Sequence, residues 1–161
     1  VRVLVDLGAV SEAPDILPNM APPKDVQMVG IDDPVGGLLA LKSRIVFERN
    51  PTVAVAMARQ VLDRTYAGLS WSRARHLLDA AHTLVSAGDE RAIEAVEAAV
   101  SAISASRFKL LYMEAGLLGE RVGLTGSLVD QAHQILEQLD HQLGSPEGFK
   151  DRWLVNSEEK P

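Results

Sequence analysis

The sequence predicts an all-α protein: a bundle of about five amphipathic helices preceded by a short extended N-terminal arm. Three observations support this fold class. From Asp32 onward, apolar residues recur at steps of three and four, which is the period of a helix with one buried face. Residues typical of helix starts and stops stand between these stretches. Of the 161 residues, 47% are hydrophobic and 24% are charged, which is the balance of a globular domain.

The first two helices share one start signal. Asp33-Pro34 and Asn50-Pro51 each place a capping side chain directly before a proline, and proline fits the first helical position. Farther along, Ser70 and Asp89 are expected caps, and Gly88 is an expected stop. The expected helices cover residues 34–49, 51–67, 71–87, 90–115 and 128–143.

The fourth expected helix is the longest and carries two irregularities. Its apolar residues first follow a stripe like the seam of a coiled coil and then shift after residues 104–107, which indicates a bend or a change of packing partner. Glycines, beginning with Gly116 and Gly119, are expected to interrupt it. Ser127 and Asp130 then form a capping box for the last long helix. The seam consists of Ile93, Val96, Val100 and Ile103.

The chain divides into three segments by composition. Residues 1–33 form the arm, in which two short β-branched stretches are a possible strand pair. Residues 34–146 form the helical domain, and residues 147–161 are expected to be a short helix with a flexible tail. Because two isolated strands are marginal in water, and because the seam resembles a coiled coil, we expect a homodimer or larger assembly.

Charge is unevenly distributed along the chain. The net charge is -6, which argues against nucleic acid as a general partner. Residues 1–33 hold two basic and six acidic side chains, a net charge of −4. Residues 34–88 hold seven basic and three acidic side chains, a net charge of +4, whereas residues 89–146 are net acidic. The two oppositely charged parts are expected to face each other, and any contact with nucleic acid is expected only through 34–88.

The composition also limits the chemistry. Cysteine is absent, so disulfides, thiolate metal sites and cysteine nucleophiles are excluded. No apolar run reaches the ~18–20 residues that a membrane span needs. We expect a cytoplasmic protein without membrane partners, cofactor or metal, and the excess of arginine over lysine is typical of a bacterial source.

Arg75 and His82 are seven residues apart, so they lie on one face of the third expected helix. An arginine that stabilises phosphate and a histidine that moves a proton are the groups that RNA cleavage needs. This R-x6-H spacing resembles the signature of the HEPN ribonucleases. The resemblance implies metal-independent RNA cleavage by a helical dimer, with Arg75 and His82 as catalytic residues. The interpretation that we favour is a solvated face, on which Arg75 and Asp79 form an i,i+4 ion pair.

A second candidate site precedes the last long helix. Thr125, Gly126 and Ser127 lead into its N-terminus, where free backbone N–H groups can bind an anion. Farther along this helix, His133 and Glu137 have a spacing that could chelate a metal, but a polar outer stripe explains them better.

No strong catalytic motif is present. We therefore expect a non-enzymatic interaction or regulatory module that acts through protein–protein contacts as a homo-oligomer. Its alternatives are the HEPN-like ribonuclease and a binder of a small ligand or anion. An interaction module requires an apolar patch that is left exposed after the bundle closes.

Overall fold

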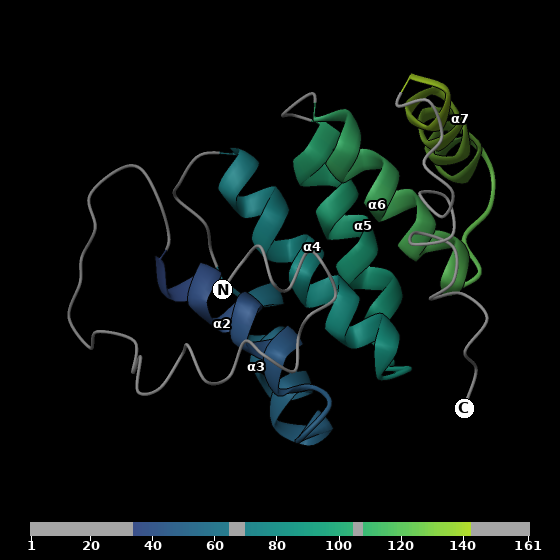
Figure 1. Cartoon of the computed structure of the whole chain (residues 1–161). Coiled ribbons are helices and arrows are strands. Elements are labelled where there is room, and N and C mark those ends of the chain that lie inside the picture. Colours follow the sequence, from purple (N-terminus) through teal and green to yellow (C-terminus); the bar gives the residue numbers. More distant parts are fainter. Residues whose placement is uncertain (1–33, 65–69, 105–107, 143–161) are drawn as a thin grey trace.

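The computed structural model describes residues 34–64, 70–104 and 108–142, and Figure 1 shows the helices that these residues form. All of the regular structure in the described residues is helical, as the sequence predicts. The helices are α2 (Pro34–Val46), α3 (Pro51–Leu62), α4 (Ser70–Ser86), α5 (Ala92–Ser104), α6 (Lys109–Arg121) and α7 (Ser127–Gln142).

Helix α4 is the centre of the bundle. It packs against α2, α3, α5 and α6, whereas α7 packs mainly against α6. Helices α4, α5 and α6 follow each other through short connections, so that α6 runs back in the same general direction as α4 (Figure 1). Consequently the first turns of α4 and α6 lie at the same end of the bundle.

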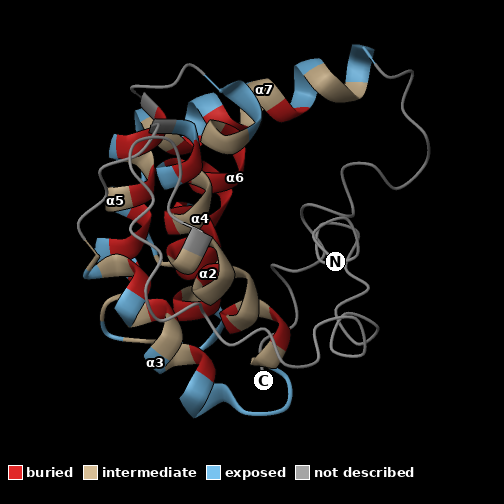
Figure 2. Cartoon of the chain, turned by 90° about the vertical axis from the view of Figure 1, so that its left-hand side faces the viewer, coloured by how far each residue is buried: buried red, intermediate tan, exposed pale blue. Residues whose placement is uncertain are grey.

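The apolar core has two parts. The larger part joins α2 to α6 and is built around the buried residues of α4, among them Leu77, Leu78 and Leu84. The smaller part lies between α6 and α7 and contains Met113 and Leu136. Figure 2 shows the buried residues concentrated along α4 and α6, and α7 extending past them with an exposed outer side.

The capping predictions for α3 and for the turn after α4 are confirmed. The Asn50 side chain accepts a hydrogen bond from the Val53 N–H at 3.2 Å, and Pro51 is the first residue of α3. Gly88 adopts a left-handed conformation with φ +60°, and the Asp89 N–H reaches back to the Leu84 carbonyl at 2.9 Å. This is the Schellman arrangement that ends a helix at glycine. The Asp89 carboxylate then accepts from the Arg91 N–H at 3.0 Å.

The expected long helix over 90–115 is wrong in its extent. The chain forms two helices in this stretch, because α5 ends at Ser104 and α6 begins at Lys109. The bundle therefore has six helices among the described residues rather than five.

The glycines do not interrupt α6, which is a second correction. Gly116 and Gly119 are buried inside the helix, because α7 crosses them closely. A Cβ atom on Gly116 would lie 2.4 Å from the Ala132 Cβ. The helix instead ends before Gly123, where φ is +83°.

The apolar seam of α5 is mostly used within the chain. Val96 and Ile103 are buried in the larger core, and only Ile93, which is 44% exposed, faces outward. The seam therefore no longer supports a coiled-coil dimer. The expected arm with its strand pair (1–33) and the expected last helix and tail (147–161) lie outside the described residues. Within the described ranges, no helix combines the length and the apolar character needed to cross a membrane.

Candidate functional site

Five ionisable side chains from three helices meet where α2, α4 and α6 pack together. We call this cluster the polar junction. Helix α4 contributes three of its members, and α2 and α6 contribute one each. The members are Arg44, Arg75, Asp79, His82 and Glu114.

Glu114 connects α6 to α4 through both of its carboxylate oxygens. Arg75 donates from its guanidinium to Oε2 at 2.9 Å, and His82 Nε2 lies 2.6 Å from Oε1. The Glu114 side chain is 9% exposed, and those of Arg75 and His82 are 21% and 20% exposed. The R-x6-H pair thus converges on one buried carboxylate.

Asp79 connects α4 to α2. Its carboxylate is buried and lies 3.2 Å from a guanidinium nitrogen of Arg44 and 3.4 Å from one of Arg75. Beside it, the Ser43 and Thr83 hydroxyls lie 2.9 Å apart, and Thr83 donates to the Asp79 carbonyl at 3.3 Å. The expected i,i+4 pair of Arg75 and Asp79 is present, but the expectation that these residues form a solvated face is wrong. Asp79 is buried because α2 and α6 cover the side of α4 that it occupies.

The polar junction is balanced in charge. Two guanidinium groups face two carboxylates, so the cluster carries no net charge when His82 is neutral. Buried charges require this kind of pairing, because an unpaired one would cost several kcal/mol. The arrangement fixes α2, α4 and α6 relative to each other. It leaves no surplus positive charge to attract a phosphate.

An exposed apolar surface lies one helical turn beyond the polar junction. Trp71 is one turn before Arg75 in α4, and Leu110 is one turn before Glu114 in α6. Because Arg75 and Glu114 are in direct contact and the two helices run in the same direction, Trp71 and Leu110 lie near each other across the helix pair. Phe108 precedes the first turn of α6.

These three residues are unusually exposed for their size. The exposed fractions are 46% for Trp71, 48% for Phe108 and 58% for Leu110. They account for three of the five large hydrophobic residues that the described part of the chain exposes to this degree. We call this surface the aromatic end.

The predicted anion site is open to solvent. Thr125, Gly126 and Ser127 are all exposed, and Gly126 has φ +92°. The Gly126 carbonyl accepts from the Asp130 N–H at 3.1 Å, so Gly126, rather than Ser127, occupies the cap position of α7. Nothing else in the described residues converges on this helix start.

The polar residues of α7 form an outer stripe rather than a chelating group. His133 Nε2 lies 3.0 Å from a carboxylate oxygen of Glu120, and both side chains are exposed. In the described ranges, no three histidine, cysteine or acidic residues stand close enough to bind a metal. Two shallow surface hollows in the described residues lie elsewhere. One runs along α7 at Gln134 and His141, and the other lies between α3 and Ala87.

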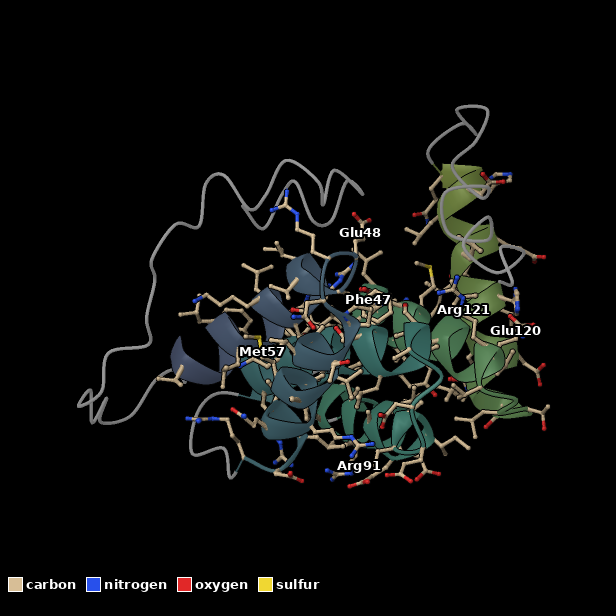
Figure 3. The ribbon with its side chains drawn as sticks, turned by 90° about the horizontal axis from the view of Figure 1, so that it is seen from below. Phe47, Glu48, Met57, Arg91, Glu120 and Arg121 are labelled. Carbon is tan, nitrogen blue, oxygen red and sulfur yellow. The ribbon has the colours of Figure 1, made fainter. Side chains whose placement is uncertain are left out.

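Two arginines of the basic segment, Arg59 and Arg75, pair with carboxylates of the acidic segment. Arg59 lies 2.8 Å from Asp89 and 3.1 Å from Glu90. In the opposite sense, Arg91 lies 2.8 Å from Asp63 and also from Glu94, on an outer edge of the bundle (Figure 3). Together with Arg75 and Glu114, these pairs give the charge complementarity that the sequence predicts. These ion pairs also engage arginine side chains that would be needed to contact the phosphates of a nucleic acid.

Sequence reasoning missed Glu114 and Arg44 as members of the polar junction and Trp71 as a member of the aromatic end. Glu114 had a usable signal, because it is the one acidic residue within the apolar stretch from Leu110 to Leu118. Arg44 and Trp71 had none, because their roles depend on which helices pack beside them.

The chain matches no known family model. The curated proteins and the solved structures contain no match to it either.

Proposed function

We propose that this chain is a non-enzymatic, cytoplasmic interaction module that self-associates through the aromatic end. The supporting observation is the exposure of Trp71, Phe108 and Leu110 at the shared end of α4 and α6. Large side chains of this kind, and tryptophan above all, dominate the energetics of protein interfaces. Clustered exposed apolar side chains are unfavourable in water, and removing them from water gives a favourable free energy of association.

The polar junction supports this function as a platform. It holds Arg75 and Glu114 in contact, and therefore fixes the helix turns that carry Trp71 and Leu110. A rigid surface loses less conformational entropy on binding than a mobile one.

Light scattering of the full chain over a range of concentrations tests the proposal. The measured mass should rise with concentration, and Leu110→Ser should raise the concentration at the midpoint of association at least about tenfold. Val53→Ser is the matched control, because Val53 is an exposed apolar residue on α3, outside the aromatic end. A mass that stays monomeric at every concentration, or equal effects of the two variants, would refute the proposal.

A ribonuclease activity is the second candidate, and one observation favours it. Arg75 and His82, the R-x6-H pair, both contact the Glu114 carboxylate. A carboxylate in this position can orient a histidine for acid–base catalysis. We rank the ribonuclease activity second because the carboxylates of Glu114 and Asp79 balance the positive charges of Arg44 and Arg75. The test is cleavage of single-stranded RNA in the presence of a chelator. Activity that is lost in both His82→Ala and Arg75→Lys would support it, whereas no cleavage by the wild-type chain would refute it.

A further inference from the structure

Helix α4 connects two exposed surfaces that lie at opposite ends of the molecule. Trp71, at the start of α4, belongs to the aromatic end, whereas Ala87 directly follows the last residue of α4. The 17 residues of α4 separate the two by about 25 Å. Figure 1 shows the starts of α4 and α6 at one end of the bundle and α3 at the other. The two surfaces therefore face away from each other.

The surface opposite the aromatic end is the shallow hollow between α3 and Ala87. We call it the α3 hollow. Most of its lining residues are exposed, and four of the six are apolar. Apolar side chains that protrude from one protein contribute most to binding when they enter such a recess on another. The lining residues are Pro51, Thr52, Val55, Ala56, Arg59 and Ala87.

Negative charge predominates beside the α3 hollow. Arg59 lies 2.8 Å from a carboxylate oxygen of Asp89 and 3.1 Å from one of Glu90, and the Glu90 side chain is 79% exposed. One guanidinium thus faces two carboxylates. The end of α4 adds partial negative charge, because its last turn has no basic residue. The α3 start carries the opposite partial charge, but the Asn50 side chain already accepts one of its free N–H groups.

The aromatic end carries positive charge. Lys109, between Phe108 and Leu110 in the sequence, is exposed. Helices α4 and α6 both begin here, and neither has an acidic residue in its first turn to offset the partial positive charge of a helix start. Two aromatic ends brought together would place like charges against each other. An aromatic end and an α3 hollow are instead complementary in charge, and one presents large apolar side chains where the other has a recess.

We propose that the chain self-associates head to tail, so that the aromatic end of one copy binds the α3 hollow of the next. This inference rests on the proposed function, which supplies the aromatic end as a self-association surface, and it adds the surface to which that end binds. Recognition combines apolar contact within the hollow with attraction between Lys109 and the exposed Glu90 carboxylate. Because the two surfaces differ and face opposite ways, every complex retains one free surface of each kind, and association continues beyond two copies.

Two variants of the full chain, each lacking one surface, test this arrangement. Leu110→Ser disables the aromatic end. Ala56→Lys fills the α3 hollow and places a positive charge where the aromatic end would bind. Gln60→Lys is the matched control, because Gln60 is exposed on the same helix but does not line the hollow. Light scattering over a range of concentrations is measured for the wild type, for each variant and for an equimolar mixture of Leu110→Ser and Ala56→Lys.

We expect the wild-type mass to rise beyond that of two chains, and Leu110→Ser and Ala56→Lys each to raise the midpoint concentration at least about tenfold. Gln60→Lys should associate like the wild type. The equimolar mixture should associate near the wild-type midpoint, because one variant retains the α3 hollow and the other retains the aromatic end. Its mass should stop at two chains, since no second intact pair of surfaces remains. This recovery also requires that both variants are folded.

A mixture that stays monomeric where the wild type associates would overturn the head-to-tail contact. A wild-type mass that levels off at two chains, or an unchanged midpoint for Ala56→Lys, would overturn it as well. In these cases the proposed function would stand, because the aromatic end would still mediate self-association. A wild-type chain that is monomeric at every concentration would overturn the proposed function and the head-to-tail contact together.

Discussion

Glu114 is the residue on which the polar junction depends. Both of its carboxylate oxygens are used, one by Arg75 and one by His82, and its side chain is almost buried. Removing one buried member of such a network leaves the charges of its partners unpaired. The resulting loss in the free energy of unfolding is larger than the net stabilisation that the intact network provides. The same geometry on the surface has little value, because water screens it.

Glu114→Gln should therefore lower the free energy of unfolding by about 2 kcal/mol, a value reduced from that of fully buried pairs because Arg75 and His82 are partly exposed. Glu120→Gln is the matched control, since Glu120 also pairs with a histidine, but at the surface, and should cost less than about 0.5 kcal/mol. Urea unfolding of both variants measures the difference. Equal losses would show that burial does not decide the value of the pair.

Asp89 links stability to pH. Burial by itself raises the pKa of this carboxyl, but the hydrogen bonds from Arg59 and from the Arg91 N–H outweigh burial and hold the pKa below its ordinary value. A lowered pKa in the folded state stabilises the protein at pH values above the unfolded-state pKa of about 3.9. This stabilisation is lost as the pH falls through the folded-state pKa.

Asp89→Asn should accordingly cost about 1 kcal/mol at pH 7, and the cost should shrink as the pH falls below the unfolded-state pKa of about 3.9 and through the lower folded-state pKa of Asp89. Urea unfolding of both proteins across this range checks the sign, with the exposed Glu137→Gln as control. A difference that stays constant with pH would contradict the assignment.

At the scale of elements, the boundaries of several helices could be predicted from nearby residues in the sequence, whereas the burial of individual side chains could not. Asn50, Pro51 and Gly88 mark helix boundaries because caps and left-handed turns involve only nearby residues. The burial of Asp79 could not be predicted from periodicity, because that reasoning assumes one buried face and α4 is covered by four helices. For the same reason, Gly116 was expected to interrupt its helix. Its actual role is to allow a close contact with Ala132, which lies sixteen residues later in the sequence.

The crossing of α6 and α7 depends on that glycine. In Gly116→Ala the new methyl group would meet the Ala132 Cβ and the Leu128 carbonyl, so that α7 would have to move away. We expect a loss of about 1–3 kcal/mol, the usual cost of overpacking. Ala132→Gly removes the methyl group on the other side, and the double variant should recover much of the loss. A double-mutant cycle from urea unfolding gives the coupling energy, and strict additivity of the two changes would contradict the close contact.

The whole molecule consists of two unequal cores that share α6. This helix contributes Ala115 and Leu118 to the larger core and Met113 and Leu117 to the smaller one. Helix α7 is held mainly by the smaller core, and much of its surface is exposed (Figure 2). The polar junction reinforces only the side of α6 that faces α4. Stability should therefore decrease from α4 toward α7.

Native-state hydrogen exchange can test this gradient residue by residue. The amides of α7, for example those of Leu136 and Leu139, should exchange through a local opening that has a smaller free energy and a smaller denaturant dependence than global unfolding. The amides of Leu78 and Leu84 in α4 should exchange only when the whole domain unfolds. In Gly116→Ala the exchange free energies of the α7 and α4 amides should both fall by about 1–3 kcal/mol, because the strained contact is relieved in the local opening and in global unfolding alike. If α7 and α4 exchanged with the same free energy in the wild-type chain, the two cores would form one cooperative unit, and the smaller core would not be an independent element of stability.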